Sequence, residues 1–477
     1  MLNPDHVRPR LQVLSELQID KVHKYSTQIL ERAGVRVDSP RAREIFSASN
    51  GVRLDKDLVY ISPDLVDWAL SKVPTTIDIF NSLGNPAFTL GDGQVRFGVG
   101  VTNLFYQDPE TERLSDFSRA HMALGTRLAH TLPAFDLVST IGIIKDVPEG
   151  SDDLYGVLEM AANTTKPLVL LNSDPTQFEA SLDLLEHLRG NLAEKPSVIP
   201  YFNPVTPLII NRETGDKIIL SIQRGLPIIF SNYGMAGTTT PISPAGTLAT
   251  LNAELLAGLV FSQLVQESAP IILGSLPAYF DMKTMSDFYD PHTILLNAAC
   301  AEMMRHYHIP HAGTSGSGLG WSADLPGAGL LWLNHLVSSL GQTGLVPFVG
   351  GTLGSKAFSP ALVVLANDVI MQSKYFASGF NLDDSTVNLD EIISTGAGGN
   401  FLMAKSTRQN FRNAYYNSSL FPRLTMEKWE QKGYPDSSFL LKQETIRLLN
   451  EIKPAPGYEN ILDAGERFIR KFIATKH

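Results

Sequence analysis

The sequence has only one cysteine, Cys300, in 477 residues. A single cysteine can form neither an intrachain disulfide nor a thiolate metal cluster, and this usage is typical of a reducing compartment. Long apolar runs are also missing, because stretches such as Leu362–Ala366 are far too short to span a bilayer. Residues 1–11 lack the apolar segment of a signal peptide. We therefore expect a cytoplasmic protein that does not associate with membranes.

Basic residues are scarce as well. The chain has 39 Lys and Arg against 49 Asp and Glu, which gives a net charge of −10. Phosphate backbones need a basic surface, so this balance argues against a nucleic-acid partner. The hydrophobic fraction of 43% and the charged fraction of 18% are ordinary for a soluble protein. The length suits one barrel domain with extensions.

Short β-rich segments recur along the middle of the chain, and amphipathic stretches separate most of them. The predicted strands are residues 95–99, 137–144, 167–172, 197–202, 227–232, 270–275, 309–314 and 346–350. The predicted helices between them include residues 121–130, 178–189, 213–224, 247–266, 292–307 and 327–341. This repeat predicts an α/β fold, a (β/α)8 TIM barrel. An open doubly wound sheet would usually have fewer strands and a glycine-rich first turn.

The two ends of the chain have a different pattern. Residues 1–90 predict an α-rich N-terminal domain with one short strand at 59–61, and residues 91–375 contain the barrel. Residues 376–477 predict a helical C-terminal extension that packs on the barrel, with helices at 426–432, 437–451 and 461–474.

The active site of such a barrel lies at the C-terminal ends of its strands. In this sequence those ends are rich in aromatic and amide side chains, and poor in carboxylates, lysines and clustered histidines. Hydrolases and aldolases on this fold usually need paired acids, a metal or a Schiff-base lysine. An aromatic site of low charge suits a quaternary ammonium, which cannot donate hydrogen bonds and binds against ring faces. The alternative for each ring is simple packing in the core.

Three further patterns have structural interpretations. His306, His308 and His311 span a helix end, a turn and a strand, so their side chains should diverge and we expect no metal site. The glycine-rich loops 313–320 and 351–356 lack the P-loop spacing, and we interpret them as loops that let a large partner approach. The acids at positions 281, 287 and 290 are interpreted as solvated.

Several segments resemble the trimethylamine methyltransferase family. They are ILERAGVRVDSPRAREIF (29–46), VRFGVG (95–100), ANTTKPLVL (162–170), MAGTTTPISPAGTLA (235–249), TGAGGNFLMAKSTRQNFR (395–412) and LFPRLTMEKWEQKG (420–433). Their order and spacing extend the resemblance over nearly the whole chain. Founding members of the family carry pyrrolysine near the end of the seventh strand, and the matching stretch here, residues 314–328, has none. The sequence thus resembles the non-pyrrolysine branch, whose members act on quaternary amines, glycine betaine foremost.

The resemblance implies methyl transfer from glycine betaine to the Co(I) of a corrinoid protein, giving dimethylglycine and methylcobalamin. The corrinoid is expected in trans, because the Asp-x-His-x-x-Gly pattern of a cobalamin domain is absent from the sequence. A quaternary ammonium already carries the charge that lets it leave as a neutral amine. We therefore expect no covalent nucleophile, only residues that hold and orient the substrate. We also expect no metal, no tightly bound cofactor, and a homo-oligomer.

Specific residues can be assigned to these roles as hypotheses. The candidate aromatic cage is Phe97, Tyr106, Tyr201, Tyr233, Phe280, Trp321 and Phe348. His311, with Asn203 and Asn232, is predicted to hold the carboxylate of a betaine. Phe97 and Arg96 should face opposite sides of one strand, and we favour Phe97 inside. The candidate contacts for the corrinoid are Gly316, Gly318 and Gly351.

Two alternatives stay open at this point. The first is the same reaction on another quaternary amine, such as proline betaine or carnitine, since pocket volume would decide the substrate. The second comes from a different class, a barrel enzyme that binds a phosphorylated metabolite at the two glycine-rich loops. A non-enzymatic betaine-binding or scaffold protein is a weaker alternative.

Overall fold

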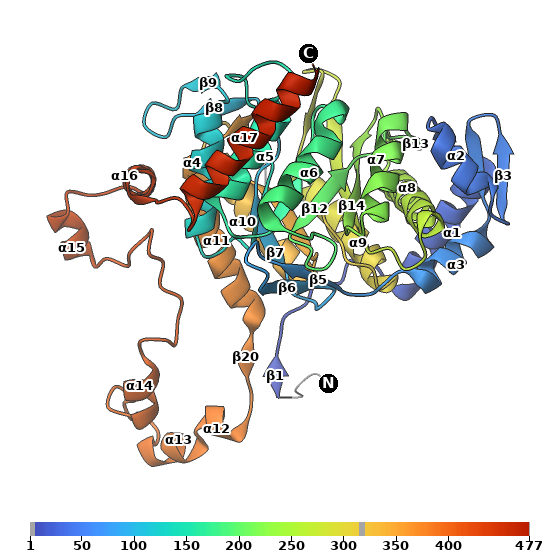
Figure 1. Cartoon of the computed structure of the whole chain (residues 1–477). Coiled ribbons are helices and arrows are strands. Elements are labelled where there is room, and N and C mark those ends of the chain that lie inside the picture. Colours follow the sequence, from blue (N-terminus) through green and yellow to red (C-terminus); the bar gives the residue numbers. More distant parts are fainter. Residues whose placement is uncertain (1–4, 314–319, 477) are drawn as a thin grey trace.

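A computed structural model gives the fold of residues 5–313 and 320–476. Its centre is a barrel of eight parallel strands (Figure 1). In order around the barrel these are β7 (Arg96–Val99), β10 (Leu137–Ser139), β11 (Leu168–Leu170), β12 (Val198–Phe202), β14 (Ile228–Ala236), β15 (Ile271–Asp281), residues 311–312 and β17 (Leu345–Val349). Residues 311–312 bridge β15 to β17, and β17 pairs with β7, which closes the barrel. The predicted TIM barrel is confirmed.

Helices follow most of the strands and surround the barrel. They are α4 (Arg119–Thr131), α5 (Asp152–Asn163), α6 (Phe178–Arg189), α7 (Arg212–Gln223), α8 (Pro244–Val265), α9 (Pro291–His306), α10 (Leu325–Gly341) and α11 (Pro360–Ser378). By length and composition α8 is apolar enough to cross a membrane, but it is buried inside the structure as a core helix. A Cβ at Gly258 would lie 2.4 Å from the Phe230 ring, so glycine lets α8 approach β14 closely.

A β-hairpin seals the N-terminal end of the barrel. It consists of β5 (Ile77–Phe80) and β6 (Pro86–Leu90). Its side chains Ile77, Ile79 and Leu90 belong to one buried cluster with inward-facing strand residues such as Ile199 and Ile229. Because this apolar cluster fills that end, a ligand has to approach from the C-terminal end of the strands.

The N-terminal elements pack against one side of the barrel. They include α1 (Glu16–Arg32), α2 (Pro40–Ser47), α3 (Pro63–Lys72), β2 (Val35–Val37), β3 (Val52–Asp55) and β4 (Leu58–Ile61). Their sheet gains a fourth strand, β13 (Ile209–Ile210), from the segment that follows β12. They share the main hydrophobic core with the barrel helices, and α1 and α3 lie on α8. A separately folding domain at residues 1–90 stays a prediction.

The C-terminal region has two parts, and only one of them packs on the barrel. The helices α16 (Ser437–Glu451) and α17 (Tyr458–Lys476) pack on the barrel helices α11 and α5. A helical C-terminal extension bounded at residues 376–477 stays a prediction. Between α11 and α16 the chain leaves the barrel (Figure 1) and forms β20 (Phe380–Asn381), α12 (Asp384–Val387), α13 (Leu389–Thr395), α14 (Lys405–Asn410) and α15 (Met426–Gln431). None of the residues in these four helices, all of which the structure describes, is buried.

Candidate active site

Tyrosine and phenylalanine rings meet inside the C-terminal end of the barrel. Tyr201 on β12 and Phe348 on β17 make an edge-to-face contact, with ring centroids 5.0 Å apart. Alternation along β14 places Tyr233 on the same inward face as Ile229, and Tyr233 pairs in register with Leu276 of β15. The strands thus bring three of the predicted cage residues to one end of the barrel.

One carboxylate reaches this cluster. β15 continues past the barrel and turns back as β16 (Ser286–Phe288), and Asp287 pairs in register with Phe280. Residues paired across two antiparallel strands share a face of the sheet, so Phe280 and Asp287 lie together. The Tyr233 hydroxyl donates a hydrogen bond to Asp287 Oδ2 at 2.5 Å. The interpretation of Asp287 as a solvated acid is therefore wrong, because the hairpin folds it back onto the barrel.

A third tyrosine completes the cluster. Tyr289 follows β16 and interacts electrostatically with both Tyr233 and Tyr201. Burial, together with Tyr289 and the Asp287 carboxylate, raises the pKa of Tyr233 far above its usual value. Burial likewise raises the pKa of Tyr201 to about 12. These phenols therefore stay protonated at neutral pH and can act as hydrogen-bond donors.

Two buried hydroxyls at this end, those of Tyr201 and Ser231, lie close to each other, and neither makes a well-formed hydrogen bond with the described residues. Ser231 lies two residues before Tyr233 on β14 and so shares its inward face. Asn203, which is exposed and follows β12, lies near the Tyr201 hydroxyl. An unsatisfied buried hydroxyl is costly, so this arrangement suits a ligand that supplies hydrogen-bond acceptors.

Glu254 on α8 supports the loop that follows β12. Its buried carboxylate accepts hydrogen bonds from the Leu208 amide, the Thr206 hydroxyl and the Asn232 side-chain amide, at 2.6, 2.9 and 2.8 Å. Burial raises the pKa of Glu254 to about 7, against the opposing effect of these three donors. No local motif in the sequence marks Glu254, because it is a lone glutamate in an apolar helix.

Phe97 and Asn232 lie on the outer face of the barrel, and their predicted place in the site is wrong. Phe97 packs edge to face against His335 of α10, with centroids 5.2 Å apart, and lies under Lys374 of α11. The Asn232 amide donates to the Leu251 carbonyl and to Glu254 on α8. Both strand faces are apolar in a barrel, so alternation alone does not tell which face points inward.

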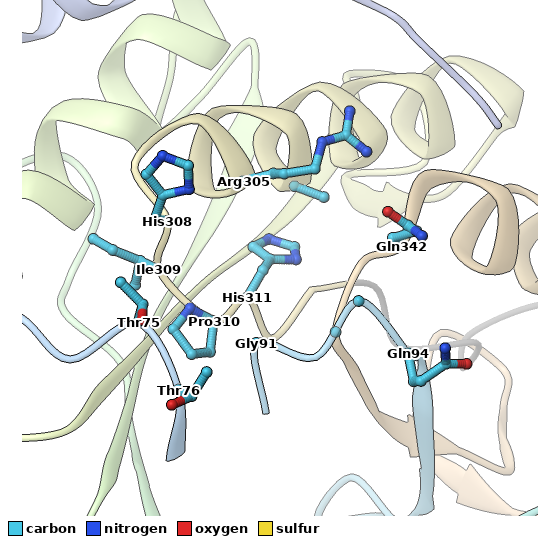
Figure 2. Close-up of a pocket in the computed structure, with 13 residues that line it drawn as sticks. Thr75, Thr76, Gly91, Gln94, Arg305, His308, Ile309, Pro310, His311 and Gln342 are labelled. Atoms are coloured by element: carbon cyan, nitrogen blue, oxygen red, sulfur yellow. The ribbon is translucent and has the colours of Figure 1, made fainter. Parts of the chain in front are cut away.

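His311 is also placed away from the barrel mouth. Its neighbour Ala312 belongs to the interior cluster, so His311 points outward, and its Nδ1 lies 2.9 Å from the Thr343 carbonyl. Figure 2 shows it beside Arg305 and Gln342 in a pocket of about 420 Å³, lined by residues that precede the strands. Burial lowers the pKa of His311 to about 4, so it is neutral. A neutral histidine at that end cannot hold a carboxylate at the mouth.

The remaining predicted residues have other surroundings. Tyr106 belongs to β8 (Phe105–Gln107) in a peripheral sheet and stacks on His121 of α4, with centroids 3.9 Å apart. Trp321 is 76% exposed at the rim. Gly351 is buried in β18 (Gly351–Thr352), which pairs with β19 (Ala357–Phe358), so the second glycine-rich loop is a β-hairpin. Gly316 and Gly318 lie outside the described residues.

The comparisons with known proteins agree with the barrel fold. The family model described as Trimethylamine methyltransferase (MTTB) matches residues 2–477. The chain belongs to the trimethylamine methyltransferase family. It is thus a methyltransferase, and the family resemblance of the sequence is confirmed.

Individual relatives are distant but cover most of the chain. Trimethylamine methyltransferase MttB of Desulfitobacterium hafniense (strain DSM 10664 / DCB-2) is 27% identical over 456 residues, 94% of this chain and 91% of that protein. Glycine betaine methyltransferase of D. hafniense (strain Y51) is 26% identical over 438 residues, 89% of each chain. The structure of Methanosarcina barkeri monomethylamine methyltransferase (MtmB) has a TM-score of 0.51 at 9% identity, over 92% of this chain and 88% of that one, and so shares the fold.

Proposed function

We propose that this methyltransferase removes a methyl group from a quaternary ammonium, glycine betaine first among them, and passes it to the cobalt of a separate corrinoid protein. The observation that carries the proposal is the group of rings from Tyr201, Tyr233 and Phe348 beside the Asp287 carboxylate. Ring faces attract a cation that has no hydrogen-bond donor, and a nearby carboxylate adds to that attraction.

The two ends of a betaine suit different parts of this site. The trimethylammonium group suits the ring faces, and the negative charge of Asp287 would attract its positive charge. The carboxylate suits the buried hydroxyls of Tyr201 and Ser231, which lie close together without a well-formed hydrogen bond, with Asn203 next to Tyr201. These three replace His311 and Asn232 as the proposed carboxylate ligands.

The chemistry needs orientation more than acid or base catalysis. In the proposed step the methyl carbon forms a bond to cobalt while its bond to nitrogen breaks, and the electron pair of that bond stays on nitrogen as the neutral dimethylglycine amine. The Co(I) corrinoid supplies the nucleophile when its protein is bound. The residues of this chain hold the cation, exclude water and aim one methyl group at the open end of the barrel. The hairpin β5–β6 closes the other end.

The rim of the barrel suits a large protein partner. Exposed apolar side chains lie on the loops that follow β12, β14 and β15, on the segment before α10 and at the first residue of α10. They are Val205, Ile242, Met282, Met285, Trp321 and Leu325. Exposed apolar residues grouped in this way mark protein interaction sites, and we assign this rim to the corrinoid protein. We therefore assign Trp321 to the surface that binds the corrinoid protein and no longer to the aromatic cage.

Two further observations support the choice of substrate. The sequence lacks pyrrolysine, the residue that the resemblance links to trimethylamine, and one relative is named a glycine betaine methyltransferase. Proline betaine or carnitine is the second candidate. The family match leaves the phosphorylated-metabolite alternative without support. We also propose a cytoplasmic location, which the single cysteine leads us to expect.

The proposal is tested with the full chain, a purified corrinoid protein in its Co(I) state and a panel of amines. Proton NMR would follow the N-methyl signals of glycine betaine, proline betaine, carnitine and trimethylamine. We expect dimethylglycine from glycine betaine and no dimethylamine from trimethylamine. Turnover of trimethylamine alone would contradict the quaternary-amine assignment.

A further inference from the structure

The pocket beside the β5–β6 hairpin, at the N-terminal end of the barrel, has no part in the proposed methyl transfer. Its volume of about 420 Å³ is in the range of pockets that hold small organic ligands (Figure 2). Residues before β5, after β6, at the end of α9 and before β17 line it. Next to these lining residues in the chain, Ile77, Ala312 and Leu345 belong to the apolar cluster that fills this end of the barrel. The pocket is therefore separate from the mouth.

His311 is the residue in this pocket that indicates a ligand, and Figure 2 shows its ring among the other lining side chains. Its Nδ1 lies 2.9 Å from the Thr343 carbonyl oxygen, which can only accept, so Nδ1 carries the proton and Nε2 presents a lone pair. Nε2 is buried and has no hydrogen-bond partner in the part of the chain that the structure describes. A buried acceptor without a donor is costly, so a ligand with an O–H or N–H group suits this position.

The backbone around His311 is fixed by close contacts. A Cβ at Gly313 would lie 1.9 Å from Cε1 of the His311 ring, so only glycine leaves room for the ring there. The Leu345 amide donates a hydrogen bond to the His311 carbonyl oxygen at 2.8 Å, and this contact belongs to the bridge that closes the barrel. A ligand on the His311 side chain would thus hold the closing strand in place and should raise the melting temperature.

Arg305 supplies positive charge to the pocket. Its side chain is 40% exposed, and its Nη2 donates to Glu302 Oε1 at 2.7 Å. Glu302 is turned toward the N-terminal segment, because its Oε2 accepts the amides of Val13 and Leu14 at 2.9 and 2.7 Å. None of the described residues that line the pocket is acidic. Because a guanidinium binds carboxylates well and has further N–H groups, the pocket suits an organic anion.

We infer that this pocket binds a small hydroxycarboxylate, an organic anion that also carries a hydroxyl group. Its carboxylate would pair with Arg305, and its hydroxyl would donate to Nε2 of His311. The side-chain amides of Gln94 and Gln342 line the same pocket and can donate to a second carboxylate. A hydroxyl suits His311 better than an ammonium, because the described lining offers no acid to balance a buried positive charge. The inference does not depend on the substrate of the barrel.

Isothermal titration of the full chain with malate and with methylsuccinate tests the inference. The two dianions have similar size, and the hydroxyl of malate takes the place of a methyl group. Malate should bind roughly tenfold more tightly, since only malate can donate to His311. Arg305→Gln should weaken the binding of both by a similar factor. The control is Arg447→Gln on α16, where the side chain is 50% exposed, and it should bind as the native chain does.

Two further variants locate the binding site. His311→Phe removes the acceptor and should bind malate and methylsuccinate equally. Ala301→Leu places a larger side chain in the pocket from α9 and should abolish binding, which keeps the test decisive if the buried His311→Phe fails to fold. Tyr201→Phe at the mouth should bind malate as the native chain does. The inference would be overturned by a native chain that does not bind malate or binds both dianions equally, or by binding that survives Ala301→Leu but is lost in Tyr201→Phe.

Discussion

The Tyr233 hydroxyl donates a hydrogen bond to Asp287 at the mouth of the barrel, which ties strand β14 to the hairpin that extends from the neighbouring strand β15. If the negative Asp287 carboxylate attracts a bound quaternary ammonium, Asp287→Asn should weaken substrate binding. We expect KM for glycine betaine to rise about tenfold, equivalent to ~1.4 kcal/mol of binding free energy. The asparagine can still accept the bond from Tyr233, so the fold should persist. Asp281→Asn in the same hairpin is the control. A KM that stays native in Asp287→Asn would remove the carboxylate from substrate binding.

The ring and the hydroxyl of Tyr201 have separate roles in the proposal. Tyr201→Leu removes the ring face and should weaken betaine binding by about 1–2 kcal/mol, the range of a desolvated cation–π contact. Tyr201→Phe keeps the ring and removes only the hydroxyl, so it should lose affinity for glycine betaine but not for tetramethylammonium, which has no carboxylate. Isothermal titration of both ligands measures the two effects. Equal losses for both ligands in Tyr201→Phe would contradict the assignment of the hydroxyl to the carboxylate.

Phe97 should affect stability and not substrate binding, because it is fully buried on the outer face of β7. Phe97→Ala should lower the free energy of unfolding by about 3–5 kcal/mol, the usual cost of emptying such a site. The milder Phe97→Leu should lower the melting temperature while the KM of the folded enzyme stays unchanged. A raised KM in Phe97→Leu, at a temperature where the variant is fully folded, would show that Phe97 takes part in substrate binding and would contradict this assignment.

Glu254 predicts a pH dependence of stability. Its pKa in the folded chain is raised from 4.5 to about 7, so the folded state holds the proton more tightly than the unfolded state. The stability gained from that proton is present below pH 4.5 and is lost as the pH rises through 7, a change of about 3 kcal/mol. Denaturant unfolding of the native chain relative to Glu254→Gln should show this loss between pH 4.5 and 7. Glu149→Gln, at an exposed position, should behave as the native chain does, and a pH-independent difference for Glu254→Gln would contradict the prediction.

The barrel could be predicted because its strands and helices leave strong local patterns. Each strand is buried on both faces and so appears as a short apolar run, as at Val198–Phe202. The helix predicted at 178–189 matches α6. Only residues 311–312 of the seventh predicted strand form ladder contacts among the described residues, yet these two close the barrel.

The site was harder to predict, because its geometry depends on contacts between distant segments. The sequence indicated Tyr201, Tyr233 and Phe348 from their positions at strand ends. It did not indicate the role of Asp287, which depends on how far β15 runs past the barrel before it turns. The inward face of β7 was assigned incorrectly, since Phe97 is equally apolar on either side. The projection of the segment between α11 and α16 could not be predicted either, because its short helices have the composition of an ordinary packed extension.

The most direct test of the central claim is the visible spectrum of cob(I)alamin mixed with the purified chain and either glycine betaine or trimethylamine. The account predicts conversion to methylcobalamin with glycine betaine and none with trimethylamine, at a rate that Asp287→Asn reduces when the substrate is below its KM. Conversion with trimethylamine but not with glycine betaine or any other quaternary amine would contradict it.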